Sequence, residues 1–222
     1  MGTDHYFTAR PASQSERRQL HLTLGGRSVT VETAAGVFSG DRLDLGTSVL
    51  LDRVPAPPPA GVFLDLGCGW GPIALTMAIL APNANVWAID SNERALELTR
   101  RNAARLGLAN IQTCLPAAVP PELRFDLIWS NPPIRIGKAE LHNLLGNWLG
   151  RLSDDGAAWL VVQRNLGADS LLEWLKTEFA PQQPQPQVTN RPALIAERAA
   201  SAKGFRILNV RVNPHTADHS RN

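Results

Sequence analysis

Three glycines at alternate positions follow a short apolar run in the first half of the chain. The run covers residues 62–66 and contains Asp65, and the glycines stand in LDLGCGWGP (64–72). Because glycine has no Cβ, such a loop lets a ligand approach the backbone closely. In an open α/β sheet, the turn after a central strand is where a cofactor binds. The residues that we expect to contact a cofactor are Asp65, Gly67, Cys68, Gly69, Gly71, Asp90, Ser91 and Asn131.

The spacing of the loop and its acidic neighbours discriminate between cofactors. A dinucleotide-binding loop has G-x-G-x-x-G before a helix that faces a pyrophosphate, whereas here the spacing is G-x-G-x-G with Pro72 next. Asp65 repels a phosphate but attracts the cationic amino group and sulfonium of S-adenosylmethionine (SAM). Asp90, at the end of the next expected strand, is placed to accept the ribose hydroxyls. These features favour SAM over NAD; the alternative is a plain tight turn whose two aspartates cap helices.

A second set of candidate residues, NPPI at 131–134, directly follows the apolar run 125–130. An exocyclic base amine is a poor nucleophile because its lone pair is delocalised into the ring. The side-chain oxygen of Asn131 and the carbonyl of Pro132 offer two acceptors for its N–H groups, which favours a tetrahedral nitrogen. The prolines fix the loop, and preorganised polar groups stabilise a transition state. The alternative is a simple turn. The expected catalytic residues are Asn131, Pro132, Pro133 and Ile134.

Asp-x-Gly-x-Gly-x-Gly with an acidic second strand end resembles the class I SAM-dependent methyltransferases. Asp65, Gly67, Gly69 and Asp90 match that pattern. The resemblance implies a seven-stranded sheet whose last strand is antiparallel, and SAM as the cofactor. That family often has an acidic or polar residue after the third strand, which receives the adenine amino group. The corresponding segment here, LPAAVPP (115–121), has no acid, so backbone groups and apolar packing would hold the adenine.

Asn-Pro-Pro after a strand resembles methyltransferases that act on amino or amide nitrogens of adenine, guanine or protein glutamine. With Ile134 in place of an aromatic residue, NPPIRIGK (131–138), GVFS (36–39) and DLGTSVLL (44–51) are similar to the RsmC family of 16S rRNA guanine-(N2) methyltransferases. The likeness is to the catalytic C-terminal half of RsmC. It implies 16S rRNA or the small ribosomal subunit as the partner, with substrate-binding roles for Phe38, Ser39, Arg135 and Lys138.

Structural interpretations compete with several of these roles. Phe38 is equally typical of a core anchor, Ser39 of a turn, Lys138 of a solvated helix start and Cys68 of a small buried thiol. Three other functions stay open at this stage. They are methylation of adenine or protein glutamine, a non-catalytic RNA-binding module with the same fold, and a nucleotide-dependent oxidoreductase, which the loop spacing disfavours.

Alternating strand and helix patterns position these motifs in a doubly wound α/β sheet. Before it, alternation in 20–24 and 29–31 around Gly25-Gly26 predicts a hairpin, and Thr47 or Ser48 is a candidate cap for a short helix at 49–51. We expect domains at 1–54 (hairpin and helix, a lid), 55–60 (Pro-rich linker), 61–212 (SAM-dependent methyltransferase) and 213–222 (flexible tail). The expected strands are 62–66, 86–90, 111–115, 125–130, 157–163, 193–198 and 205–212, and the expected helices are 72–80, 92–106, 138–152 and 170–179.

Composition limits the remaining possibilities. The chain has 222 residues, 44% hydrophobic and 19% charged, with a net charge of +2. These values are typical of a soluble globular protein that can bind nucleic acid only through a local basic patch. Two cysteines without a Cys/His cluster indicate a reducing compartment and no metal site. No apolar run reaches the ~20 residues of a membrane span, so we expect a cytoplasmic protein.

Overall fold

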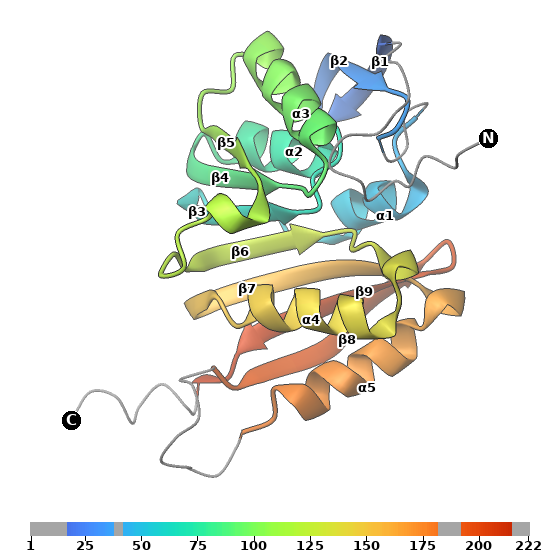
Figure 1. The fold of residues 1–222 in the computed structure, drawn as a ribbon, viewed down its shortest axis with the longest axis vertical. Helices are drawn as coiled ribbons and strands as arrows, with labels where there is room; N and C mark the ends of the chain where they lie inside the picture. Colours follow the sequence, from blue (N-terminus) through green and yellow to red (C-terminus); the bar gives the residue numbers. More distant parts are fainter. Residues whose placement is uncertain (1–16, 38–41, 182–191, 215–222) are drawn as a thin grey trace.

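A seven-stranded sheet forms the centre of the fold in the computed structural model, which describes residues 17–37, 42–181 and 192–214 (Figure 1). From one edge to the other its strands are β5 (Ile111–Cys114), β4 (Asn83–Ile89), β3 (Ala60–Leu66), β6 (Phe125–Ser130), β7 (Leu152–Gln163), β9 (Phe205–Val212) and β8 (Leu194–Ala202). The first five strands pair in parallel, and β9 lies antiparallel between β7 and β8. The predicted doubly wound, mostly parallel sheet and its antiparallel last strand are confirmed.

Helices cover both faces of this sheet because its inner strands are apolar on both sides. One face buries Leu64, Ile128 and Leu160 under α4 (Lys138–Leu149) and α5 (Ala168–Glu178). The other buries Phe63 and Trp129 under α1 (Leu45–Arg53), α2 (Pro72–Leu80) and α3 (Glu93–Leu106). Short 3₁₀ turns lie at Pro116–Ala118, Ile134–Ile136 and Arg164–Leu166. The strand order reverses between β3 and β6, since the chain first builds β3, β4 and β5 toward one edge and then continues with β6 on the other side of β3. Ligands bind at this point in folds of this kind.

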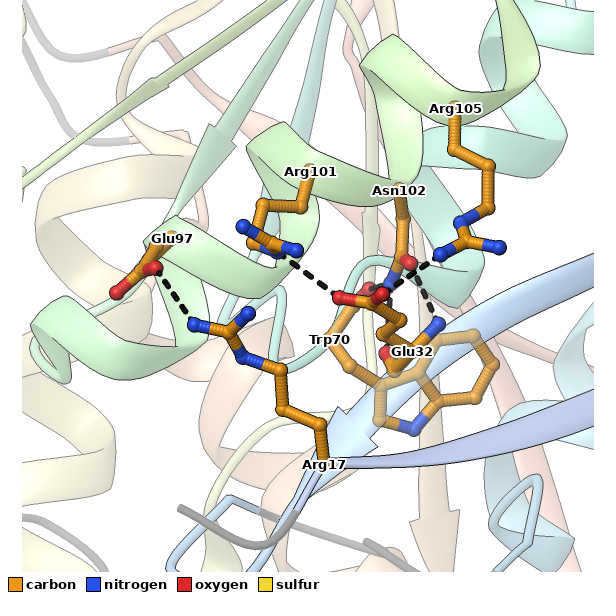
Figure 2. Close-up of polar contacts among 7 residues, drawn as sticks. All are labelled: Arg17, Glu32, Trp70, Glu97, Arg101, Asn102 and Arg105. Atoms are coloured by element: carbon orange, nitrogen blue, oxygen red, sulfur yellow. Dashed lines mark hydrogen bonds and ion pairs between the residues drawn. The ribbon is translucent and has the colours of Figure 1, made fainter.

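The predicted hairpin is a separate two-stranded sheet of β1 (Arg17–Leu24) and β2 (Arg27–Ala34). Its apolar side packs against α2 and α3, and polar contacts fasten it to α3 (Figure 2). Arg101 and Arg105 contact the carboxylate of Glu32 at 2.9 and 2.6 Å, and Arg17 approaches Glu97 at 3.6 Å. The hydrogen bond from Arg101 holds the pKa of Glu32 below its usual value. The hairpin is therefore fixed to the helix that follows β4.

The helix after the hairpin begins earlier than its sequence suggests. We expected Thr47 or Ser48 to cap it, but α1 begins at Leu45, and the carboxylate of Asp44 accepts a hydrogen bond from the Thr47 backbone N–H at 2.9 Å. That expectation is wrong because Asp is as good an N-cap as Ser or Thr. The apolar run 49–51 covers only the second half of the helix, so it does not indicate where the helix begins. The correction matters because Asp44 and Thr47 both reach the site described next.

Candidate active site

A cavity of about 740 Å³ opens at the carboxyl ends of β3, β4 and β6. Its size suits a small-molecule cofactor together with part of a substrate. The glycine loop lines one part of it and the Asn131–Ile134 segment another, so the two motifs that the sequence singled out share one cavity. The predicted site residues that line it are Gly67, Cys68, Gly69, Asp90, Ser91, Asn131, Pro132, Pro133, Ile134 and Arg135.

The glycine loop presents bare backbone to this cavity. Gly67 and Gly69 have φ of 81° and 58°, and a Cβ built on either would meet no atom within 4 Å. The space that side chains would fill is therefore open. The loop itself is fixed from the neighbouring strand, because the Ile89 carbonyl accepts hydrogen bonds from the N–H groups of Gly67 and Cys68, each at 2.9 Å. The result is a rigid concave cradle in which a ligand can approach the main chain.

Asp90 holds the same loop from the end of β4. Its two carboxylate oxygens accept hydrogen bonds from the backbone N–H groups of Gly69 and Asn92, each at 2.9 Å. Burial raises the pKa of this carboxyl, and the hydrogen bonds from Asn92, Gly69 and Ser91 oppose that change. An ionised carboxylate has about four acceptor sites. Asp90 therefore keeps acceptor capacity on the side that lines the cavity.

Asp65 lies behind the loop and does not line the cavity. The side chain is fully buried, and its Oδ2 accepts a hydrogen bond from the Ala74 N–H of α2 at 2.9 Å. No described residue hydrogen-bonds its buried Oδ1. Burial, and to a smaller extent the charge of Asp90, raises the pKa of Asp65 to about 8 against the opposing effect of the Ala74 N–H. Asp65 therefore anchors the loop to the start of α2.

The segment that contains Asn131 is held next to the end of β3, which leads into the glycine loop. The Ser130 hydroxyl, at the end of β6, donates to the Leu66 carbonyl at the end of β3, at 2.7 Å. Beyond it, Pro133 has φ −74° and ψ 76°, and the Ile134 N–H donates to the Pro132 carbonyl at 2.8 Å. These values describe an inverse γ-turn. Its Pro132 carbonyl keeps a second lone pair, so it remains an acceptor.

The side chain of Asn131 is held by its amide nitrogen. Asn131 Nδ2 donates to Asp44 Oδ2 at 2.7 Å and to Thr47 Oγ1 at 3.1 Å. Within the described part of the chain no group donates to Asn131 Oδ1, and the residue lines the cavity. The oxygen of this cavity-lining residue, one acceptor of the predicted pair, is therefore left without a competing donor among the described residues.

Some predicted residues lie elsewhere. Gly71 does not line the cavity, and a Cβ there would lie 2.9 Å from side-chain atoms of Thr99. Lys138 is exposed at the start of α4, outside the cavity lining, and Phe38 and Ser39 lie outside the described residues. Sequence reasoning missed several lining residues that come from distant segments, among them Asp44, Thr47, Gln163, Leu166 and Phe205. Asp44 could have been identified from the sequence, because aspartate is a preferred residue at helix N-caps.

SAM fits this donor set better than a phosphate-bearing cofactor does. The open glycine cradle accommodates the ligand, and the residues placed to hold it are Gly67, Gly69, Asp90 and Ser91. The Asp90 carboxylate, which lines the cavity at the end of β4, favours a cationic ligand over an anionic one. In the described ranges, no cluster of three or more His, Cys, Asp or Glu side chains could hold a metal ion. Those ranges also contain no helix with the length and apolarity of a membrane span.

Comparison with known proteins identifies the family. Residues 28–184 match the model of the methyltransferase small domain. "Uncharacterized protein YbxB" of Bacillus subtilis (strain 168) is 34% identical over 180 residues, which cover 80% of this chain and 90% of that protein. "Ribosomal RNA small subunit methyltransferase C" of Aeromonas hydrophila subsp. hydrophila is 33% identical over 153 residues, which cover 67% of this chain and 44% of that protein.

A solved structure gives the same fold. The T. thermophilus 16S rRNA N2 G1207 methyltransferase (RsmC), in complex with AdoMet and guanosine, superposes with a TM-score of 0.71 at 22% identity. The match covers 91% of this chain and 52% of that chain. The chain thus spans about half the length of these two RsmC proteins. The open cradle and the family match agree, and the predicted cofactor is confirmed: the chain belongs to the methyltransferase small domain family and is a SAM-dependent methyltransferase.

Proposed function

We propose that the chain methylates an exocyclic base amine, the N2 of a guanine in 16S rRNA. The observation that carries the proposal is the shared cavity, in which an open glycine cradle and the Asn131–Pro132 acceptors line one space. Likeness to two RsmC proteins supports rRNA as the substrate and guanine N2 as the acceptor. The isoleucine at position 134, which lines the cavity, distinguishes this site from the aromatic position expected of adenine and glutamine enzymes.

The chemistry follows from the acceptors around the amine. When bound, SAM supplies a methyl carbon activated by its sulfonium. Asn131 Oδ1 and the free lone pair of the Pro132 carbonyl accept the two N–H groups of the amine, which directs the nitrogen lone pair toward that carbon. The γ-turn at Pro133 and the contacts of Asn131 Nδ2 fix both oxygens beforehand. Such preorganisation lowers the barrier without reorganisation during the reaction. The methylated nitrogen then loses its proton to solvent.

Cations at the rim of the cavity support an RNA substrate. Arg135 is exposed and lines the cavity, and Arg164 follows the lining residue Gln163. The Arg164 N–H donates to the Gly204 carbonyl at 2.8 Å, which places Lys203 beside it. Across the described segments, none of these three cations has an ion-pair partner, whereas Arg206 pairs with Asp169 at 3.5 Å. Unpaired cations of this kind bind phosphates and position a strand without reading its sequence.

The test is transfer of labelled methyl groups from SAM to 16S rRNA and to small ribosomal subunits, followed by identification of the nucleoside. Labelled N2-methylguanosine is the expected product. Labelled adenosine, or label in protein, would contradict the guanine proposal. Absence of transfer to every substrate, with SAM bound, would favour the non-catalytic module instead.

Asn131→Ala tests the assigned chemistry. We expect SAM affinity by calorimetry to remain near that of the parent protein, while kcat falls about 100- to 1,000-fold, as when one preorganised hydrogen-bonding group is removed from an active site. Asn85→Ala is the matched control, because within the described ranges the Asn85 side chain on β4 hydrogen-bonds only the exposed Gln112 side chain. Near-normal turnover in Asn131→Ala would refute the role of its side-chain oxygen.

A further inference from the structure

The structure assigns Asp44 as a positioning residue that fixes the amide orientation of Asn131. The inference rests on the proposed function, because it concerns how the acceptor oxygen of that site is aimed. Asp44 Oδ2 accepts two hydrogen bonds, from Asn131 Nδ2 at 2.7 Å and from the Thr47 backbone N–H at 2.9 Å. One carboxylate oxygen therefore caps α1 and grips the asparagine at the same time.

The chemistry of this contact decides which way the amide faces. An asparagine side chain rotated by half a turn exchanges its oxygen and nitrogen, and only hydrogen-bond partners distinguish the two orientations. An ionised carboxylate accepts hydrogen bonds but cannot donate them. Asp44 therefore requires the nitrogen of Asn131 on its side. Asn131 Oδ1 is thereby directed away from Asp44, into the position where it can accept from an amine.

The N-cap role keeps Asp44 in place. The Thr47 N–H is one of the helix N–H groups with no partner inside α1, so it needs the Asp44 oxygen whether or not a substrate is bound. Thr47 reinforces the arrangement, since its hydroxyl is the second acceptor of Asn131 Nδ2 at 3.1 Å. Asp44 and Thr47, at the start of α1, thus form a fixed pair of acceptors, called the bracket below, that positions Asn131 in the loop after β6.

Packing at Gly46 shows how little room this bracket leaves. A Cβ on Gly46 would lie 2.9 Å from Asp44 Oδ2, 3.0 Å from a ring carbon of Phe205 and 3.3 Å from Asn131 Nδ2. These distances are shorter than ordinary van der Waals contacts, and a methyl group there must displace at least one of the three. Gly46→Ala therefore perturbs the bracket without altering any hydrogen-bonding group.

Asp44→Ser and Asp44→Asn form a matched pair that tests the assignment. Serine caps a helix as well as aspartate does, but its hydroxyl is shorter and can donate as well as accept. We expect Asp44→Ser to fold and bind SAM normally and to lower kcat about 10- to 100-fold, as for loss of a hydrogen bond to a charged group. KM for the RNA should change little. Asp44→Asn should rescue kcat to near the parent value, because its oxygen can still accept from both Thr47 and Asn131.

Two further measurements complete the test. Gly46→Ala should lower kcat, and the higher helix propensity of alanine should offset part of the stability lost to the close contacts of its methyl group. The side-chain NH₂ signals of Asn131 in a ¹⁵N spectrum, identified by their loss in Asn131→Asp, should shift further in Asp44→Ser than in Asp44→Asn, which keeps an acceptor oxygen at this position.

The outcomes separate this inference from the proposed function. If Asn131→Ala is inactive while Asp44→Ser keeps full kcat, the positioning role is refuted and the proposed chemistry stands. If Asp44→Asn loses as much activity as Asp44→Ser, the negative charge itself is required and the positioning assignment is wrong. If Asn131→Ala is fully active, the proposed chemistry fails. In an Asn131→Ala background, Asp44→Ser should cause no further loss in kcat.

Discussion

Removing the side chain of Asn102 should destabilise the fold and weaken cofactor binding together. Asn102 is fully buried on α3 and bonds to two separate segments (Figure 2). Its Oδ1 accepts from the Glu32 N–H at 2.7 Å, and its Nδ2 donates to the carbonyls of Glu32 and Trp70, each at 2.9 Å. In Asn102→Ala these backbone groups of β2 and of the glycine loop lose their partner. Each unsatisfied buried group costs about 1–3 kcal/mol.

We therefore expect Asn102→Ala to lower the free energy of unfolding by about 3–5 kcal/mol. For a chain of this size that corresponds to a fall in Tm of about 10 °C. Urea denaturation followed by circular dichroism measures the first quantity, and calorimetry with SAM measures the loss of affinity. Asn85→Ala, which removes one exposed side-chain contact, should stay within about 0.5 kcal/mol of the parent. If Asn102→Ala matched that control, the three bonds would not hold the hairpin and loop.

Two other predictions concern the cofactor loop. Gly67→Ala forces a Cβ at φ 81° into the open cradle, so it should cost about 1–2 kcal/mol of stability and weaken SAM binding at least tenfold. Gly26→Ala, at φ 78° in the hairpin turn, should cost similar stability without changing SAM affinity, and equal SAM affinity in the two variants would refute the cradle. The free energy of unfolding should fall as pH rises from about 4 to about 8, because the folded chain retains the proton that burial holds on Asp65. Asp65→Asn should flatten this pH dependence in denaturant titrations; an unchanged slope would assign it to other groups.

The central sheet and the two motifs at its strand ends could be predicted from the sequence, because local residue patterns determine them. Helix α2 begins and ends where Pro72 and the apolar run predict, and β6 covers the expected residues 125–130. Helix α4 ends at Leu149, short of the expected 152, because Gly150 follows it. Strand β7 extends back to Leu152, since its first part pairs across an irregularity in register with β6.

The composition of the site was only partly predictable, since burial and distant contacts determine the rest. A sequence pattern cannot show that Asp65 lies behind the loop, or that Gly71 faces Thr99. Phe205 reaches the cavity only because β9 pairs with β7 and aligns it with Gln163. Asp44 reaches Asn131 across 87 positions of sequence. Contacts of that separation carry no local signature.

The residues that line the cavity come from both ends of the described chain, which affects the order in which the site forms during synthesis. Asp44 and Thr47 belong to the early part of the chain, whereas Phe205 stands on the last strand and closes against the same corner. During synthesis the cofactor cradle can therefore form well before the acceptor side is complete. Long-range contacts of this kind form late in folding. The acceptor side of the site is therefore expected to be complete only after β9, which carries Phe205, has joined the sheet between β7 and β8.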